Sequence, residues 1–185
     1  GASDRGGAQV TEQDPTRNPD FLHYTVDRDL AWPCAPLFEI AADVERYPEF
    51  LPGWKAVRTK PDDQADYATD QMLAFGPVRE RFTSKTYLER PHRIRVISQS
   101  RTFRHFEVNW RFAGLDDAKC RVHLDAHMGF KSRYMKGIVG KMLGRRLDEI
   151  LVAFERRAAA LLGAPGVDPA GAEPLERARG GDRRS

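Results

Sequence analysis

Two segments in the second half of the chain alternate strictly between apolar and polar residues. Every even position is apolar in residues 106–112 and again in residues 120–130. A period of two predicts β-strands with one face toward a core and one face toward water. The link between the two segments is short, which favours an antiparallel pair. The second half of the chain is therefore expected to form a sheet with one wet face.

Similar strand patterns occur in five further segments before residue 101. In the first strand that it predicts, Leu22, Tyr24 and Val26 fall on the opposite face from their polar neighbours. Short links rich in turn residues separate the predicted strands, which favours an antiparallel meander. The complete set of predicted strands comprises residues 21–29, 54–60, 66–75, 78–89, 93–100, 104–113 and 119–130.

Residues 132–162 change to a helical period. Ser132 is a suitable N-cap for this helix and Gly163 a suitable stop. A single amphipathic helix after seven strands can bury its apolar stripe across the concave face of the sheet. The stripe comprises Met135, Ile138, Val139, Met142, Leu143, Leu147, Ile150, Leu151, Phe154, Ala158 and Leu161.

Residues 37–54 are expected to begin as a helix, which Pro48 and Pro52 then interrupt. The segment carries more large apolar groups than a solvent-exposed loop needs, which indicates a broken helix that turns them inward. The chain is therefore predicted to be α+β. We expect a helix-grip fold, with a seven-stranded antiparallel sheet curved around a long C-terminal helix and two short helices after the first strand.

At 185 residues the chain has the length of one domain. Residues 1–20 and 163–185 are rich in Gly, Pro, Ala and charge, so we expect both to be disordered and residues 21–162 to form the domain. No run approaches the roughly 18 apolar residues needed to span a bilayer. Cys34 and Cys120 lack metal-ligand spacing, and we expect both to be reduced and buried, as in a cytosol-like compartment.

The order of strand, broken helix pair, six strands and long helix resembles the START-like superfamily, also called the polyketide cyclase/dehydratase superfamily. Within it the chain is similar to the coenzyme Q-binding protein family, whose bacterial relatives include the ribosome association toxin family. The resemblance covers residues 21–162. It rests on Asp43-Val44-x-x-Tyr47-Pro48-x-Phe50-x-Pro52 with Trp54, on Trp110-Arg111-Phe112, and on Ala153-Phe154-Glu155-x-Arg157-Ala158.

The chain departs from the family pattern at Gly53, which separates Pro52 from Trp54 where the family places an aromatic directly after the proline. A second departure is residues 101–106, where the family tends to have a Gly-Pro-Phe motif. We expect the ligand preference of this protein to differ from that of its relatives at Trp54.

Motifs for catalysis and metal binding are mostly missing from the sequence. There is no Gly-rich phosphate loop, paired-Cys metal site, HExxH or GxSxG. His123 and His127 fall on the outward face of their strand with Asp125, so we expect solvated histidines and no metal. Glu80 is the one carboxylate in an inward register, which is little support for acid–base catalysis. We expect no catalytic residues and no enzymatic activity, with a cyclase or dehydratase as an alternative.

A carrier of hydrophobic ligands needs a cavity lined by aromatic and aliphatic groups, and the sequence can supply one. Gly137, Gly140 and Gly144 lie within one stretch of the last helix, where each costs roughly 1 kcal/mol relative to alanine. They indicate a close backbone approach, space for a ligand, or a gate. The candidate ligand-binding residues are Tyr47, Phe50, Leu51, Trp54, Phe75, Phe82, Trp110, Met128, Phe130, Met135, Val139 and Met142.

Basic residues gather in the first half of the last helix, in a stretch without acidic residues. Such a half-helix is attracted to an anionic membrane surface. Further arginines fall on outward strand positions and could contact phosphates of RNA as readily as lipid headgroups. The candidate membrane or phosphate contacts are Lys131, Arg133, Lys136, Lys141, Arg145 and Arg146.

The resemblance implies a carrier or chaperone for an isoprenoid lipid, ubiquinone, that supports respiratory electron transport or quinone biosynthesis. It implies a bound lipid and no required cofactor. We expect a cytoplasmic protein peripheral to the inner membrane, on the matrix side in a mitochondrion, with a hydrophobic small molecule and the anionic membrane as partners. The alternative partner is the ribosome or RNA, because the ribosome association branch implies a regulator that blocks subunit association.

Overall fold

The computed structural model of the protein describes residues 20–98, 100–101 and 103–165, apart from the side chains of Phe75 and of residues 142–147. The predicted flanking segments, residues 1–20 and 163–185, lie almost wholly outside the described residues.

The described chain forms one seven-stranded antiparallel sheet with the strand order β1-β7-β6-β5-β4-β3-β2. Each strand from β2 onward pairs with the next in sequence, as the short links predict. β1 closes the order by pairing along its whole length with β7, from Phe21 opposite Gly129 to Leu30 opposite Cys120. The strands are β1 (Phe21–Leu30), β2 (Trp54–Lys60), β3 (Tyr67–Phe75), β4 (Val78–Glu89), β5 (Arg93–Ser98), β6 (Phe103–Asp116) and β7 (Lys119–Phe130).

The helices lie in two places along the chain. Between β1 and β2 are α1 (Cys34–Ala42), a 3-10 turn η1 (Val44–Arg46) and α2 (Tyr47–Phe50), and after β7 comes α3 (Arg133–Leu162). α3 begins where its sequence predicts, because the Ser132 side chain accepts a hydrogen bond from the Met135 backbone N–H. It ends at Gly163, which has a φ of 82° that glycine adopts readily.

The helix break after α1 lies earlier than predicted. α1 ends at Ala42, well before Pro48, and Pro48 lies in the first turn of α2, where a missing N–H costs nothing. The expectation that Pro48 interrupts the first helix is therefore wrong. Two tyrosine hydroxyls satisfy carbonyls at the end of α1: Tyr47 donates to Ala41 O, and Tyr67 donates to Ala42 O at 2.8 Å. Such terminal carbonyls have no partner within their own helix.

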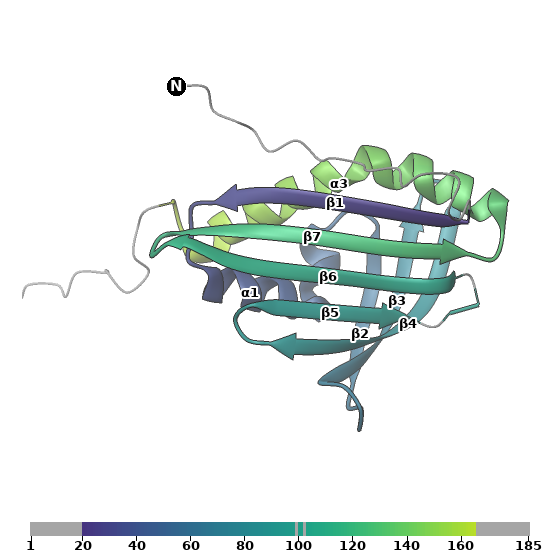
Figure 1. Cartoon of the computed structure of the whole chain (residues 1–185), viewed down its shortest axis with the longest axis horizontal. Coiled ribbons are helices and arrows are strands. Elements are labelled where there is room, and N and C mark those ends of the chain that lie inside the picture. The colour runs from purple at the N-terminus through teal and green to yellow at the C-terminus, as the bar shows by residue number, and fades with distance from the viewer. Residues whose placement is uncertain (1–19, 99, 102, 166–185) are drawn as a thin grey trace, which may run out of the picture.

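The sheet wraps around the helices, as Figure 1 shows. β1, β7, β6 and β5 run along the long axis, while β2 and β3 lie behind them and are steeply inclined to them, and β4 bends from the direction of β3 to that of β5. α3 and α1 lie on the same side of this curved sheet. The buried core comprises the inward residues of the strands, most of α1, and Leu151, Phe154 and Ala158 of α3. The predicted helix-grip arrangement is confirmed.

Cys34 and Cys120 form a disulfide, so the prediction that both are reduced is wrong. Cys34 begins α1, and Cys120 is an inward residue near the start of β7, with their Cα atoms 5.0 Å apart. Their separation of 86 residues hides this proximity in the sequence. The bond ties the helix that follows β1 to the strand that pairs with β1.

We predict that reduction of this disulfide lowers the free energy of unfolding by about 2–5 kcal/mol, because it releases the loop constraint on the unfolded chain. Urea unfolding with and without reductant measures the change. The matched control is the double variant Cys34→Ala/Cys120→Ala, whose stability should not respond to reductant. Two thiols that react with iodoacetamide in the folded, unreduced protein would contradict the bond.

Candidate functional site

A cavity of about 190 Å³ lies between the concave face of the sheet, the α1–α2 segment and α3. Its wall is almost entirely apolar and is formed by inward residues of β3 to β7, by Ala41, Val44 and Leu51, and by Val139 and Ile150 of α3. The strong curvature of the sheet leaves this space, because one helix cannot fill a concave face along its whole length.

Seven of the twelve candidate ligand-binding residues line this cavity. Phe130 is instead fully buried in the core, Met135 packs against the core from α3, and Phe50 faces a shallower groove beside Pro52 and α3. The side chains of Phe75 and Met142 lie outside the described residues. The seven that line the cavity are Tyr47, Leu51, Trp54, Phe82, Trp110, Met128 and Val139.

Several lining residues were not among the candidates. Phe103, Phe106, Val96 and Val108 all face the cavity. Phe106 and Val108 share the face of Trp110 by the alternation of residues 106–112, so the sequence carried the signal for these two. Val96 shares the face of Ile94 by alternation within β5, so the sequence carried a signal for it as well. Phe103 faces the cavity because the register of β6 shifts between Phe103 and His105, which the alternation does not specify.

Aromatic rings in edge-to-face contact lie where the broken helix segment borders one end of the cavity. The Tyr47 ring packs edge-to-face against Phe50 and Trp54, with centroids 5.8 and 5.9 Å away. Gly53 has a φ of 90°, a left-handed conformation that turns the chain into β2 so that Trp54 begins that strand. The glycine inserted in the family motif therefore sets the position of the Trp54 ring.

A small polar network lies beside this aromatic end. Trp54 Nε1 donates to Gln71 Oε1 at 3.1 Å, and Gln71 Nε2 donates to Thr69 Oγ1 at 2.9 Å and to Ser84 Oγ at 3.1 Å. All three partners on β3 and β4 are buried. Within the described part of the chain, every buried side-chain nitrogen or oxygen has a hydrogen-bond partner. Through Gln71 the network adds a polar group to a mostly apolar cavity.

Glu80 is the only acidic side chain among the described residues that line the cavity, and no described histidine lines it. General acid–base catalysis commonly combines two titratable groups that point at one substrate. The described lining contains no such pair.

The two halves of α3 are held differently. Ile150, Leu151, Phe154 and Ala158 in the second half are buried, whereas no described residue before Ile150 is. In the first half, Tyr24 Oη donates to the Gly140 carbonyl at 3.3 Å. A Cβ added at Gly140 would only reach ordinary contact with Tyr24 and Leu22, and one added at Gly137 would meet nothing within 4 Å. The glycines therefore accompany a loosely packed half-helix.

The predicted basic contacts lie on this half-helix and just before it. Lys131, Arg133 and Lys141 are exposed, and Tyr134 beside them is 76% exposed. Lys136 is half-buried, and the side chains of Arg145 and Arg146 lie outside the description.

Several outward strand cations are neutralised by acidic partners. Arg121 pairs with Asp29 at 2.7 Å, Arg95 with Glu107 at 2.7 Å, and Lys85 with Asp62 at 3.5 Å. The outer face of the sheet is therefore less basic than the sequence pattern indicated.

The outward histidines are not freely solvated, contrary to the sequence-based expectation. His123 Nδ1 lies 2.7 Å from Asp27 Oδ1, and His127 Nε2 lies 3.0 Å from Asp125 Oδ1. His23, which the pattern did not single out, lies 2.7 Å from the same Asp125 oxygen. His127 and Asp125 lie two residues apart on β7, whereas the pairs His123–Asp27 and His23–Asp125 depend on the register of β1 against β7, which brings together residues about 100 positions apart.

The fold and its mostly apolar cavity define a helix-grip, START-like domain. The family model for polyketide cyclase/dehydrase and lipid transport matches residues 30–155, and the chain belongs to this family. None of the described helices is both long and apolar enough to cross a membrane.

Two curated relatives and one solved structure show the range of this similarity. The ribosome association toxin RatA of Pseudomonas aeruginosa is 27% identical over 134 residues, which are 72% of this chain and 93% of that protein. The mitochondrial coenzyme Q-binding protein COQ10 homolog B of Xenopus laevis is 24% identical over 163 residues, 85% of this chain and 66% of that protein. The Zhui aromatase/cyclase of Streptomyces sp. R1128 superposes with a TM-score of 0.69 at 17% identity, covering 79% of this chain and 98% of its own.

We predict that the tyrosine contact with α1 makes the protein sensitive to alkali. Burial raises the pKa of Tyr67 to about 12, whereas an unfolded tyrosine titrates near pH 10. Between these values the unfolded state binds fewer protons, so the free energy of unfolding falls as the pH rises, by roughly 2–3 kcal/mol up to pH 12. Chemical unfolding of the wild type and Tyr67→Phe across this range measures the effect.

In Tyr67→Phe the fall in the free energy of unfolding up to pH 12 should be smaller than in the wild type by roughly 2–3 kcal/mol. Tyr134→Phe, which removes an exposed hydroxyl, should keep the wild-type profile. Identical profiles for Tyr67→Phe and the wild type would contradict the prediction.

Proposed function

We propose that this domain binds an isoprenoid lipid of the ubiquinone class in its cavity and carries or presents that lipid at a membrane. The observation that carries the proposal is the cavity itself: its lining is mostly apolar, with Gln71, Glu80 and Thr86 as polar exceptions, and Trp54 is hydrogen-bonded to Gln71 at one end. A quinone ligand has the matching form, a polar carbonyl-bearing ring joined to an apolar chain.

The size of the cavity specifies how such a lipid would bind. About 190 Å³ is below the roughly 300–1,000 Å³ of sites that enclose drug-sized ligands. The cavity suits the quinone ring and the first part of the isoprenoid chain, and the rest of the isoprenoid chain must extend out of the domain. The first half of α3 offers the exit, since none of its described residues is buried and its glycines permit movement.

The similarity to COQ10 homolog B supports this choice of ligand, because that protein's name states coenzyme Q binding and the similarity extends over 85% of this chain. Docking at an anionic membrane would use Lys131, Arg133 and Lys141 with the exposed Tyr134 at the start of α3. Tyrosine is suited to a membrane interface, where its ring is apolar and its hydroxyl remains wet.

We predict that Val108→Trp reduces retained lipid at least about tenfold, equivalent to about 1.4 kcal/mol. Val108 lines the cavity from β6 and is only partly buried, so an indole there occupies ligand space while an apolar group still packs against the core. Mass spectrometry of organic extracts from purified protein, with added ubiquinone in a second series, measures the lipid. The matched control is Ala113→Trp, which adds the same group on the same strand at an exposed position.

Equal lipid in Val108→Trp, Ala113→Trp and the wild type would contradict binding in this cavity. Circular dichroism melting curves show that each variant is folded before the lipid is compared.

The second candidate function is regulation of the ribosome, and the similarity to RatA favours it, since 93% of that protein is covered. The contact would use the same basic surface at and near the start of α3, where Lys131, Arg133 and Lys141 are exposed.

Co-sedimentation with ribosomal subunits at low and high salt separates the two functions. If the domain acts on the ribosome, Lys131→Glu/Arg133→Glu should abolish co-sedimentation and Val108→Trp should not affect it. If the domain is a lipid carrier, the wild type should stay in the supernatant even at low salt.

A further inference from the structure

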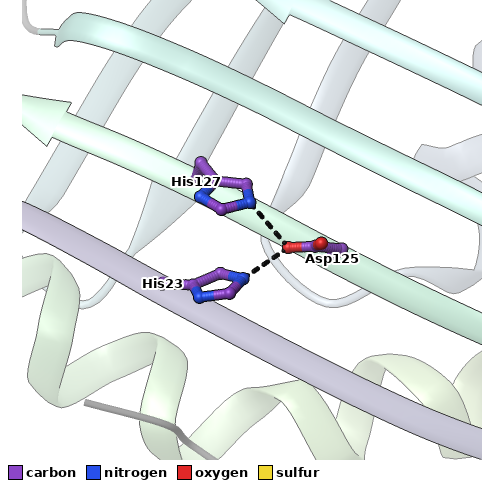
Figure 2. A group of neighbouring side chains, drawn as sticks. All are labelled: His23, Asp125 and His127. Carbon is purple, nitrogen blue, oxygen red and sulfur yellow. Dashed lines mark hydrogen bonds and ion pairs between the residues drawn. The ribbon is translucent and has the colours of Figure 1, made fainter. Parts of the chain in front are cut away.

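Two histidines and one aspartate meet on the outer face of the sheet, away from the cavity. His23 lies on β1, and Asp125 and His127 lie on β7, with His23 directly opposite His127 in the register. Figure 2 shows that both imidazoles point toward one oxygen of Asp125. One possible ligand atom from each residue lies within 4.8 Å of the other two.

We propose that His23, Asp125 and His127 form a binding site for a divalent transition-metal ion, with Zn²⁺ as the best fit. Neutral imidazole nitrogen and carboxylate oxygen bind Zn²⁺ at about 2.0–2.2 Å, and three protein ligands leave the fourth position for water. Two tetrahedral ligands at that distance lie roughly 3.3 Å apart. The Nε2 atoms lie 2.7 and 3.0 Å from Asp125 Oδ1, so a small spreading of the three groups admits the ion.

The surroundings hold the three side chains in place while leaving them accessible. The side chains of His23 and Asp125 are 18% and 22% exposed, and that of His127 is 37% exposed. The two imidazole rings stack with centroids 4.0 Å apart and planes 14° apart. Ligands restrained by a paired sheet lose less conformational freedom on binding than ligands on loops do. The open side of His127 gives the ion a path of entry.

The groups that neighbour the site are one ion-paired carboxylate and two uncharged polar side chains, and none of them carries a free positive charge toward it. On β6, Glu107 lies opposite His127 and Asn109 opposite Asp125, while Thr25 lies opposite Asp125 on β1. Glu107 already accepts from Arg95 Nε at 2.7 Å and from Asn109 Nδ2 at 3.1 Å. It is thereby held as a second carboxylate beside the site.

A bound ion would join the edge strand β1 to β7. Leu22 and Tyr24, the neighbours of His23 on β1, lie closest to Gly140 of α3. Zinc would therefore brace the wall against which the loosely packed half of α3 rests.

The first test is titration calorimetry of the tag-free, oxidised full chain with ZnCl₂, after removal of metal by EDTA and dialysis, at about pH 7.5, where free imidazole is neutral. We expect one ion per chain. His23→Ala and His127→Ala should each weaken binding at least about tenfold, since loss of a supporting contact alone costs about 10–100-fold at other metal sites.

His123→Ala is the matched control. His123 lies on the same face and strand, but it pairs with Asp27 and has no second histidine beside it. Its removal should leave the affinity for zinc unchanged. The proposal is overturned if zinc does not bind, if both alanine variants keep the wild-type affinity, or if His123→Ala weakens binding equally.

A second measurement keeps the test valid even if an alanine variant fails to fold. In NMR spectra of the unaltered protein, zinc should shift the ring signals of His23 and His127 and leave those of His92 and His123 in place. Shifts confined to other histidines would overturn the proposal.

Discussion

The pairing of β1 with β7 is the interaction on which the rest of the structure depends. It joins strands about 100 residues apart and makes the first strand the neighbour of the last. On the inner face it brings Tyr24 to the Gly140 carbonyl of α3. On the outer face it brings His23 to His127 and Asp125. Because α1 follows β1 directly, the same pairing places Cys34 beside Cys120, and the disulfide then fixes that end of the sheet.

The cavity depends on a second constraint, the early end of α1. Once the helix stops at Ala42, its free carbonyls accept from Tyr47 and Tyr67, and these two rings anchor the short turns that follow. The positive φ of Gly53 then turns Trp54 into β2 beside Gln71. The aromatic rings thus close one end of a curved sheet whose other boundary, the first half of α3, is lightly packed. A cavity with a well-packed aromatic end and a lightly packed helix along one side would suit a ligand longer than the cavity.

Most titratable groups of the described chain lie outside the cavity. Glu80 is the only acidic side chain among the described residues that line it, and no described histidine lines it. They gather on the outer face, where Arg95 pairs with Glu107, Arg121 with Asp29 and His123 with Asp27. Lys131, Arg133 and Lys141 are exposed at and near the start of α3, at the side where the proposed lipid would enter or leave. Binding at a surface and release through α3 would then involve the same part of the molecule.

The sequence by itself determined the elements and their inward faces, because the periods of two and 3.6 depend only on local geometry. The alternation in β6 and β7, the Ser132 cap and the Gly163 stop could all be predicted from neighbouring residues, and so could Trp110 and Phe82 in the cavity. Only the tertiary structure decided what depends on register between distant strands. Cys34 with Cys120, His23 with His127, and Phe103 at the cavity wall each require the position of β1 against β7 or the register shift in β6. No local pattern records these positions, since they arise from packing across the whole domain.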